Sequence, residues 1–164
     1  MNFRIEEKSA FTIVGKGIRV STNNGEQNIR IPKFWDESYE NGFCQNLASK
    51  AGELGIIGAC KDFDTSSGEF TYMIAAEKTD ENASLNLEES EVPASTWAIF
   101  ESIGPLPAAI QKVWHNIYSE WFPTSGYEHG VGPELEIYYP GNPSDEDYKS
   151  EVWIPVKKNR VGRQ

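Results

Sequence analysis

The two halves of this 164-residue chain carry the same order of predicted elements, and this repetition constrains the fold more than any other feature. The first half opens with a stretch rich in β-branched residues at 10–22, which is typical of a strand. A helical segment follows at 31–49, and two further β-rich runs occupy 54–63 and 70–78. This half therefore predicts a strand, a helix and a hairpin.

The second half repeats that order. Residues 95–103 alternate like a strand, and residues 108–122 have helical periodicity. Residues 134–139 and 149–156 form a second predicted hairpin. We therefore expect an α+β fold built as a tandem βαββ repeat with pseudo-twofold symmetry, in which an antiparallel sheet carries helices on one face.

Both predicted helices have local signals. Pro32 is expected in the first turn of the first helix, where the missing N–H of proline costs no hydrogen bond. Gly42 is expected to weaken the C-terminal half of that helix. The second helix has an apolar stripe at Ile110, Trp114, Ile117 and Trp121. We expect Trp35, Trp114 and Trp121 to pack mainly in the core.

Polar segments set the limits of the two halves. Residues 79–91 are acidic and polar, which predicts a linker or an exposed excursion. The halves are therefore expected at about 8–80 and 92–158 within one domain spanning 1–164, with a tail at 159–164. The basic residues near the end, which we expect to be frayed and solvated, are Lys157, Lys158, Arg160 and Arg163.

Composition excludes several classes of function. Fifteen Lys and Arg against 25 Asp and Glu give a net charge of -10, which repels phosphate backbones and attracts cations. We therefore expect no direct nucleic-acid binding. No stretch approaches the roughly 18 apolar residues of a membrane span, and the N-terminus lacks the apolar core of a signal peptide. A cytoplasmic protein without membrane contact is expected.

Cysteine and histidine usage indicates neither a metal nor a cofactor. Cys44 and Cys60 lack CxxC spacing and are expected to be buried thiols in a reducing compartment. His115 and His129 have no companion ligand at short spacing. Ser125 lacks the flanking glycines of a nucleophile elbow, and no familiar catalytic motif occurs.

Strand alternation identifies candidate ligand-binding residues. In the strand 134–139, Glu134, Glu136 and Tyr138 lie opposite Leu135, Ile137 and Tyr139. In the strand 149–156, Glu151 and Trp153 lie opposite Val152, Ile154 and Val156. We expect the aliphatic faces to pack against the helices. The faces with rings and carboxylates then need something else to cover them.

If the two units meet at these second faces, their junction is a cleft walled by rings with carboxylates inside. Such a cleft suits a lipophilic cation, because each aromatic face attracts a positive charge by about 0.5–2 kcal/mol and a buried carboxylate needs a countercharge. Residues 70–76 show a weaker version, with Phe70, Tyr72 and Ile74 on one face. Alternation alone is also compatible with a solvated face, on which Glu and Tyr are common.

Several segments resemble the GyrI-like family. They are 121–128 (Trp-Phe-Pro-Thr-Ser-Gly-Tyr-Glu), 132–138 (Gly-Pro-Glu-Leu-Glu-Ile-Tyr) and 151–156 (Glu-Val-Trp-Ile-Pro-Val). The N-terminal half agrees through 11–15 and 31–35. Members of this family are effector-binding domains of AraC-type and MerR-type multidrug regulators, and also free-standing proteins. The resemblance covers essentially the whole chain.

The resemblance implies a tandem βαββ fold with a ligand cleft between the halves. It also implies that Glu136 is the acid at the bottom of this cleft that meets cationic ligands. Aromatic walls are typical of the family, which favours Tyr138, Trp153, Tyr72 and Trp97 as ligand-binding residues. Because no helix-turn-helix precedes or follows the domain, we expect regulation of DNA only if a partner protein supplies the DNA-binding part.

Three functions follow as alternatives. The first is a sensor or sequestering protein for a hydrophobic, cationic small molecule, with Glu136 neutralising the ligand's charge. The second is suggested by free-standing family members that resemble hydrolases opening the cyclopropane of DNA-alkylating natural products, with Glu136 as the catalytic residue. The third is an acidic inhibitor of a DNA topoisomerase, supported here only by the net charge.

Overall fold

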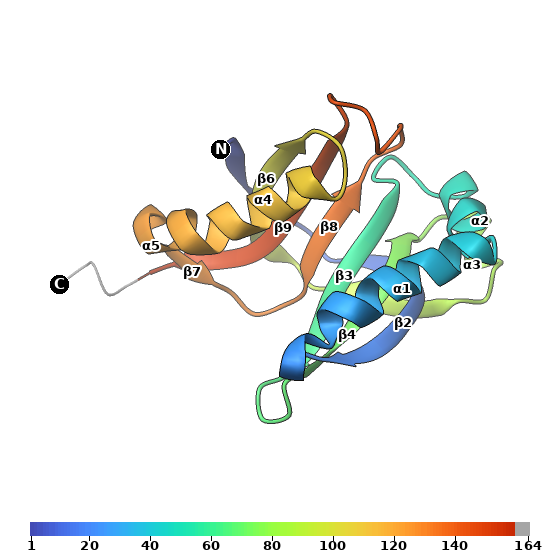
Figure 1. The fold of residues 1–164 in the computed structure, drawn as a ribbon, viewed down its shortest axis with the longest axis horizontal. Helices are drawn as coiled ribbons and strands as arrows, with labels where there is room; N and C mark the ends of the chain where they lie inside the picture. Colours follow the sequence, from blue (N-terminus) through green and yellow to red (C-terminus); the bar gives the residue numbers. More distant parts are fainter. Residues whose placement is uncertain (160–164) are drawn as a thin grey trace.

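One antiparallel sheet runs through the whole protein (Figure 1). The structure is a computed structural model that describes residues 1–159, so Arg160 and Arg163 of the expected tail lie outside the described residues. The strands follow the order β1-β6-β9-β8-β3-β4-β2-β5, and β7 pairs with β9 outside this path. Their bounds are β1 (Phe3–Lys8), β2 (Phe11–Ser21), β3 (Ile56–Asp64), β4 (Glu69–Glu77), β5 (Glu88–Val92), β6 (Ser95–Ile103), β7 (Tyr127–His129), β8 (Glu134–Tyr138) and β9 (Lys149–Lys158).

The helices are short and lie between the strands of each half. Their bounds are η1 (Asn23–Gly25), α1 (Gln27–Glu40), α2 (Phe43–Ser49), α3 (Asp80–Ala83), α4 (Ala108–Asn116), the π-helical turn η2 (Ile117–Trp121) and α5 (Phe122–Ser125). Among residues 1–159, none of these helices has the length and apolar character needed to cross a membrane.

The repeated order of elements is confirmed. The first half is β2-α1-α2-β3-β4 and the second is β6-α4-β8-β9. The halves join edge to edge where β3 pairs with β8, and the strand order on one side of this junction mirrors that on the other. This order is the one expected for a twofold axis between β3 and β8. The predicted tandem βαββ fold therefore holds, with α1 and α4 on the same face of the sheet (Figure 1).

The first helix differs from its prediction at the start and agrees at the end. It begins at Gln27, so Pro32 lies inside the helix rather than in its first turn. The carbonyl of Glu26 accepts the first hydrogen bonds, from the N–H groups of Ile29 and Arg30. Gly42 has a φ of 82° and separates α1 from α2, because glycine adopts this left-handed conformation readily.

Two short connections force the sheet to curl. Ser9-Ala10 joins β1 to β2, and Pro93-Ala94 joins β5 to β6, although each pair stands near opposite ends of the strand order. Such a connection spans at most about 11 Å, so the two ends of the sheet must approach each other. A core fills the concave face between them, with its largest fully buried side chains at Trp97, Ile13, Ile57, Met73, Ile99, Leu135 and Ile137.

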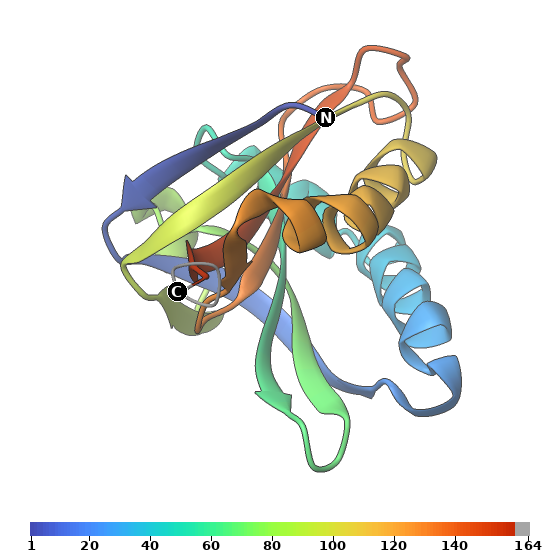
Figure 2. The same cartoon turned by 90° about the vertical axis from the view of Figure 1, so that its left-hand side faces the viewer.

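The helices cover the other, convex face. One cluster under α4 includes Val152 and Ile154, and another under α1 and α2 includes Tyr72 and Ile74. Figure 2 shows both helical layers on one side of the strands. The predicted assignment of faces in 134–139 is therefore wrong. Leu135 and Ile137 lie in the concave core, and the helices flank the face with Glu136 and Tyr138.

Three further predictions need correction. Lys157 and Lys158, expected in a frayed terminus, belong to β9 and pair with β7. The segment 79–91, expected as a linker or an exposed excursion, is mostly exposed, but it contains α3 and most of β5, which pairs with β2. Its acidic side chains suit an edge strand, because charges at an edge discourage pairing with another chain. Residues 3–8, for which no strand was predicted, form β1 and pair with β6.

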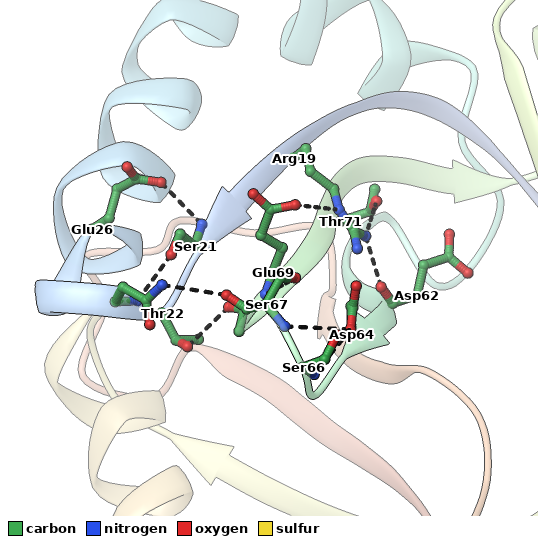
Figure 3. A network of polar contacts seen from close by, with 12 residues as sticks. Arg19, Ser21, Thr22, Glu26, Asp62, Asp64, Ser66, Ser67, Glu69 and Thr71 are labelled. Atoms are coloured by element: carbon green, nitrogen blue, oxygen red, sulfur yellow. Dashed lines mark hydrogen bonds and ion pairs between the residues drawn. The ribbon is translucent and has the colours of Figure 1, made fainter.

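Polar contacts hold the β3–β4 hairpin against the end of β2 (Figure 3). Asp64 Oδ1 accepts hydrogen bonds from the backbone N–H of Ser66 at 3.0 Å and from its hydroxyl at 2.6 Å. The N–H of Thr22 donates to the carbonyl of Gly68 at 2.8 Å. Arg19 Nη1 donates to the carbonyl of Asp62 at 2.7 Å. These contacts join the hairpin to the chain at the end of β2.

Candidate functional site

Glu136 lies where the two halves meet. On β8 it pairs in register with Gly58 of β3 on one side and with Val152 of β9 on the other. Paired residues of antiparallel strands project to the same face, and Val152 packs under α4. The carboxylate therefore projects to the helix-bearing face. Its strand, β8, lies between α1 and α4 in the ribbon view (Figure 1).

A chain of hydrogen bonds links the two helices through this carboxylate. Trp114 of α4 donates from Nε1 to Glu136 Oε2 at 2.8 Å. The hydroxyl of Tyr72 donates to Glu136 Oε1 at 3.1 Å. Trp35 of α1 in turn donates from Nε1 to the Tyr72 hydroxyl at 2.9 Å. One tryptophan from each half thus converges on a single acid.

Gly58 makes room for this arrangement. A Cβ atom at this position would lie 2.4 Å from the Tyr72 hydroxyl oxygen and 3.0 Å from Glu136 Oε1. The first distance is too short for any side chain, so only glycine allows the phenol and the carboxylate to meet here. Gly58, on the strand opposite Glu136, therefore leaves the space that the carboxylate and the phenol occupy.

Aromatic rings surround Glu136. Trp35 meets Tyr138 edge to face with centroids 5.5 Å apart, and it stacks on Tyr39 at 6.2 Å. Trp114 stacks on Tyr118 at 6.3 Å with the planes only 7° apart. Tyr39 and Tyr118 are each 49% exposed, and Trp35 and Trp114 are half-buried. The rings therefore offer apolar surface to a ligand while they shield the acid.

Burial raises the pKa of Glu136 above its ordinary value. Hydrogen bonds from Trp114, Tyr138 and Tyr72 act in the opposite direction but do not outweigh burial. Glu136 is nevertheless partly exposed, so solvent reaches the acid although the packed rings remove most of its hydration. No Lys or Arg of residues 1–159 forms an ion pair with it, which leaves a carboxylate that lacks a countercharge.

The structure brings together only part of the predicted set. Tyr72 and Tyr138 lie beside Glu136, as expected for one site. Trp97 and Trp153 lie in the concave core on the opposite face, with their rings 5.8 Å apart. Trp153 pairs in register with Leu135 rather than with Glu136, so the prediction that it shares the Glu136 face is wrong.

Glu151 likewise belongs to the concave side and has its own partners. Its carboxylate accepts hydrogen bonds from Tyr139 at 2.6 Å and from Trp153 Nε1 at 3.0 Å, and Arg4 Nη1 lies 3.1 Å away. Burial alone would raise the pKa of Glu151, but these hydrogen bonds and the Arg4 charge hold it below its ordinary value. This acid is already neutralised, in contrast to Glu136.

Three residues of the site were missed by sequence reasoning. Trp35 and Trp114 were expected mainly as core residues, and Tyr118 was not considered. Helical spacing identified Trp114 correctly as part of an apolar stripe, but a stripe does not distinguish a ring that seals the core from a ring at its border. Trp121, at the same spacing, does lie in the core and is 7% exposed.

Two surface hollows lie away from these residues. One is lined by residues at the start of β2 and around α3, including Phe11, Lys78 and Asp80. The other is lined by residues near Phe63 and Val131. Neither includes Glu136. The rings around Glu136 pack against one another, so a ligand at this acid must lie on their exposed faces or part them.

Comparison with known proteins relates this arrangement to a family. The family model described as a GyrI-like small molecule binding domain matches residues 1–157. A DNA gyrase inhibitor of Erwinia billingiae (strain Eb661) is 27% identical over 103 residues, which make up 63% of this chain and 56% of that protein. This chain thus spans little more than half the length of that curated relative.

Solved structures share the fold. SAV2435 bound to tetraphenylphosphonium aligns with a TM-score of 0.83 and 24% identity over 96% of this chain and 94% of that one. A second protein, from Staphylococcus aureus MU50, aligns with a TM-score of 0.77 and 26% identity over 96% of this chain and 99% of that one. Both alignments include nearly the whole chain, which confirms the predicted fold.

Proposed function

Because this chain belongs to the GyrI-like family of small-molecule-binding domains, we propose that it binds a lipophilic cation at Glu136, as a sensor or sequestering protein. The binding surface in this proposal is the helix-bearing face between α1 and α4. Its members are Glu136, Tyr72, Tyr138, Trp35, Trp114 and Tyr118.

The observation that carries the proposal is a carboxylate without a countercharge among aromatic rings. Glu136 is hydrogen-bonded by Trp114 and Tyr72 but forms no ion pair within residues 1–159. A cation placed on these rings gains about 0.5–2 kcal/mol from each ring face and the attraction of the carboxylate in addition. A neutral ligand of the same shape gains only burial of apolar surface.

A related fold supplies the probe. SAV2435 has been solved with tetraphenylphosphonium, an apolar cation whose charge does not depend on pH. We expect it to bind here, with its phenyl groups against the tryptophan and tyrosine rings. Tetraphenylborate has the same shape and the opposite charge, so it separates the contribution of charge from that of shape.

The test measures both probes by isothermal titration calorimetry with native protein and with Glu136→Gln. We expect the substitution to weaken tetraphenylphosphonium binding at least about tenfold, which corresponds to a charge interaction of about 1.4 kcal/mol. Native protein should bind tetraphenylborate more weakly than tetraphenylphosphonium, and Glu136→Gln should reduce this difference in affinity. Equal affinity of native protein and Glu136→Gln for tetraphenylphosphonium would refute the proposal.

Two controls exclude trivial explanations. Glu81→Gln changes the net charge equally, but Glu81 is exposed on α3 and should leave affinity unchanged. Thermal unfolding checks that each variant is folded.

Thermal unfolding also tests the raised pKa of Glu136. Because folding raises this pKa above 4.5, the contribution of Glu136 to stability is complete below pH 4.5 and is lost as pH rises through the raised pKa. A neutral glutamine avoids this loss, so Glu136→Gln should melt at or above the native temperature at pH 7.

The raised pKa of Glu136 also supports a second candidate, hydrolysis of a cyclopropane-bearing alkylator at the same site. A carboxyl group with a raised pKa in an apolar site can act as a general acid or base, and the hydroxyls of Tyr72 and Tyr138 lie beside it. Incubation with such a compound should yield the ring-opened, hydrated product if this is the function. Stoichiometric capture without turnover favours the receptor.

The name of the Erwinia relative supports a third candidate, inhibition of DNA gyrase. Its match extends over 56% of that protein, and the acidic composition is the other supporting feature. A supercoiling assay tests it directly. Full gyrase activity at excess protein would remove this candidate and leave the ligand-binding proposal intact.

A further inference from the structure

A second carboxylate lies on the same face as Glu136. Glu134 precedes it by two positions on β8, and its side chain is 13% exposed. Tyr118 donates a hydrogen bond from its hydroxyl to Glu134 Oε2. The ring of Tyr118 is the one that stacks on Trp114, the donor to Glu136. Two acids therefore lie next to one pair of stacked rings.

His129 provides Glu134 with a partner. His129 Nε2 lies 2.9 Å from Glu134 Oε2, and Nδ1 lies 2.6 Å from the carbonyl oxygen of Gly130. Both ring nitrogens thus face oxygens that only accept hydrogen bonds. A neutral imidazole can donate one such bond, whereas an imidazolium donates both. The hydrogen bond to Glu134 also raises the pKa of His129, against the opposing effect of burial.

The other groups around His129 do not compete for this role. On β7, Glu128 projects to the opposite side and pairs with Lys157 of β9 at 3.4 Å. Val156 of β9 faces His129 in register, and the ring of Phe122 stacks on the imidazole at 6.3 Å. Lys158 of β9 faces Tyr127, and Cys60 of β3 faces Glu134 as a thiol whose pKa burial raises. Within residues 1–159, Glu134 is the carboxylate that forms an ion pair with His129.

We propose that Glu134 is a second countercharge for the cationic ligand, and that the proton on His129 decides whether its charge is available. The inference rests on the proposed function of the Glu136 site. With His129 protonated, the Glu134–His129 pair is neutral and the ligand meets one negative charge. With His129 neutral, it meets two. Protons and ligand cations therefore compete, and each lowers the affinity for the other.

The expected effect is moderate. Residues two apart in a strand are about 7 Å apart, so Glu134 lies within electrostatic range of a cation bound at Glu136. Allowing for screening by solvent and salt, we expect the affinity for a permanent cation to increase about threefold to tenfold as His129 loses its proton. Cations with a permanent charge are the favoured ligands. They stay charged at the pH where His129 loses its proton and the charge of Glu134 becomes available.

The experiment measures the dissociation constant of tetraphenylphosphonium from pH 5.5 to 9 for native protein, His129→Gln and Glu134→Gln. Native protein should bind about threefold to tenfold more tightly above the titration of His129 than below it. Glu136 is present in native protein and in both variants, so its ionisation does not distinguish them. The His129 step should vanish in His129→Gln, which stays at the tight limit. In Glu134→Gln it should move to lower pH, and above it the affinity should stay at the weak limit of native protein.

A second readout does not depend on affinity. NMR titration of the His129 ring in free protein should give a pKa above 6.5, which falls in Glu134→Gln and in native protein saturated with tetraphenylphosphonium. The exposed His115 on α4 gives a reference signal in the same spectrum. The inference would be overturned by a His129 pKa that is the same with and without ligand, or by an affinity step at the pH of the native His129 titration that keeps its full size in His129→Gln. Absence of any tetraphenylphosphonium binding at all would instead refute the proposed function.

Discussion

At the scale of single residues, the site depends on a difference between the two halves. Glu136 and Gly58 face each other across the junction of β8 and β3, near the axis that relates the halves. If both positions held glutamate, two like charges would meet at the centre of the sheet and raise each other's pKa. Glycine in one half and glutamate in the other leave a single acid with room around it.

This pairing predicts a sharp response to Gly58→Ala. The added methyl group would lie 2.4 Å from the Tyr72 hydroxyl, so the phenol must move and its hydrogen bond to Glu136 must break. We expect a loss of about 1–3 kcal/mol in the free energy of unfolding, together with weaker tetraphenylphosphonium binding. Gly52→Ala is the control, because the added Cβ would lie 3.9 Å from the nearest atoms, which is an ordinary contact distance. Equal effects of both substitutions would contradict the assignment.

Trp114 is predicted to set the acidity of Glu136. Trp114→Phe keeps a ring but removes the Nε1 donor, so the pKa of Glu136 should rise further, as measured by carboxyl carbon NMR. Trp121→Phe is the matched control on the adjoining turn, since the buried Nε1 of Trp121 has no hydrogen-bond partner. That variant should lower stability and leave the pKa of Glu136 unchanged. A Glu136 pKa that is the same in Trp114→Phe and native protein would contradict this role.

The sequence predicted these residues unevenly. Alternation and family resemblance identified Glu136, Tyr138 and Tyr72, because strand periodicity and a specific motif both apply to them. Trp153 was placed wrongly, because alternation is counted within each strand and the relation between neighbouring strands depends on register. Register places Val152, not Trp153, beside Glu136. Trp35 reaches the site through a hydrogen bond to another side chain, which no local pattern encodes.

At the scale of elements, the strands and helices of each half were predictable but their faces were not. Both faces of β8 and β4 carry large apolar side chains, so composition does not tell which face the helices cover. The face that the helices cover is determined by the two-residue connections, which bring the ends of the sheet together over the concave side. Long-range geometry of this kind has no signature in any single strand.

One ion pair is predicted to stabilise the edge strand β1 in addition to its pairing with β6. Arg4 reaches Glu151, whose side chain is fully buried, while Arg4 itself is 44% exposed. Because Arg4 is well solvated, we expect Arg4→Ala to cost only about 1–2 kcal/mol of unfolding free energy at pH 7. Folding lowers the pKa of Glu151, so this contribution is present above pH 4.5 and is lost as pH falls through the lowered value.

Chemical denaturation at pH 7 and at low pH measures this difference. Lys157→Ala is the control, because Lys157 and Glu128 form an exposed pair at 3.4 Å that should contribute less than about 0.5 kcal/mol. A loss of stability in Arg4→Ala that persists unchanged at low pH would show that Arg4 acts by packing rather than by charge.

At the scale of the whole molecule, duplication explains why the site lies where it does. Two βαββ units joined through β3 and β8 place one helix on each side of the junction, and each helix contributes a tryptophan to the acid between them. The internal repeat was visible in the sequence, which is why the fold was predicted well. The expectation that the halves meet face to face was wrong, since they meet edge to edge and share one continuous sheet.

The most direct test of this account is a crystal structure of the complex with tetraphenylphosphonium. The phosphonium centre should lie on the helix-bearing face beside the Glu136 carboxylate, with phenyl groups against Trp35 and Trp114. A cation found in the concave core beside Trp97 and Trp153, or at either of the surface hollows, would contradict the central claim that Glu136 receives the ligand.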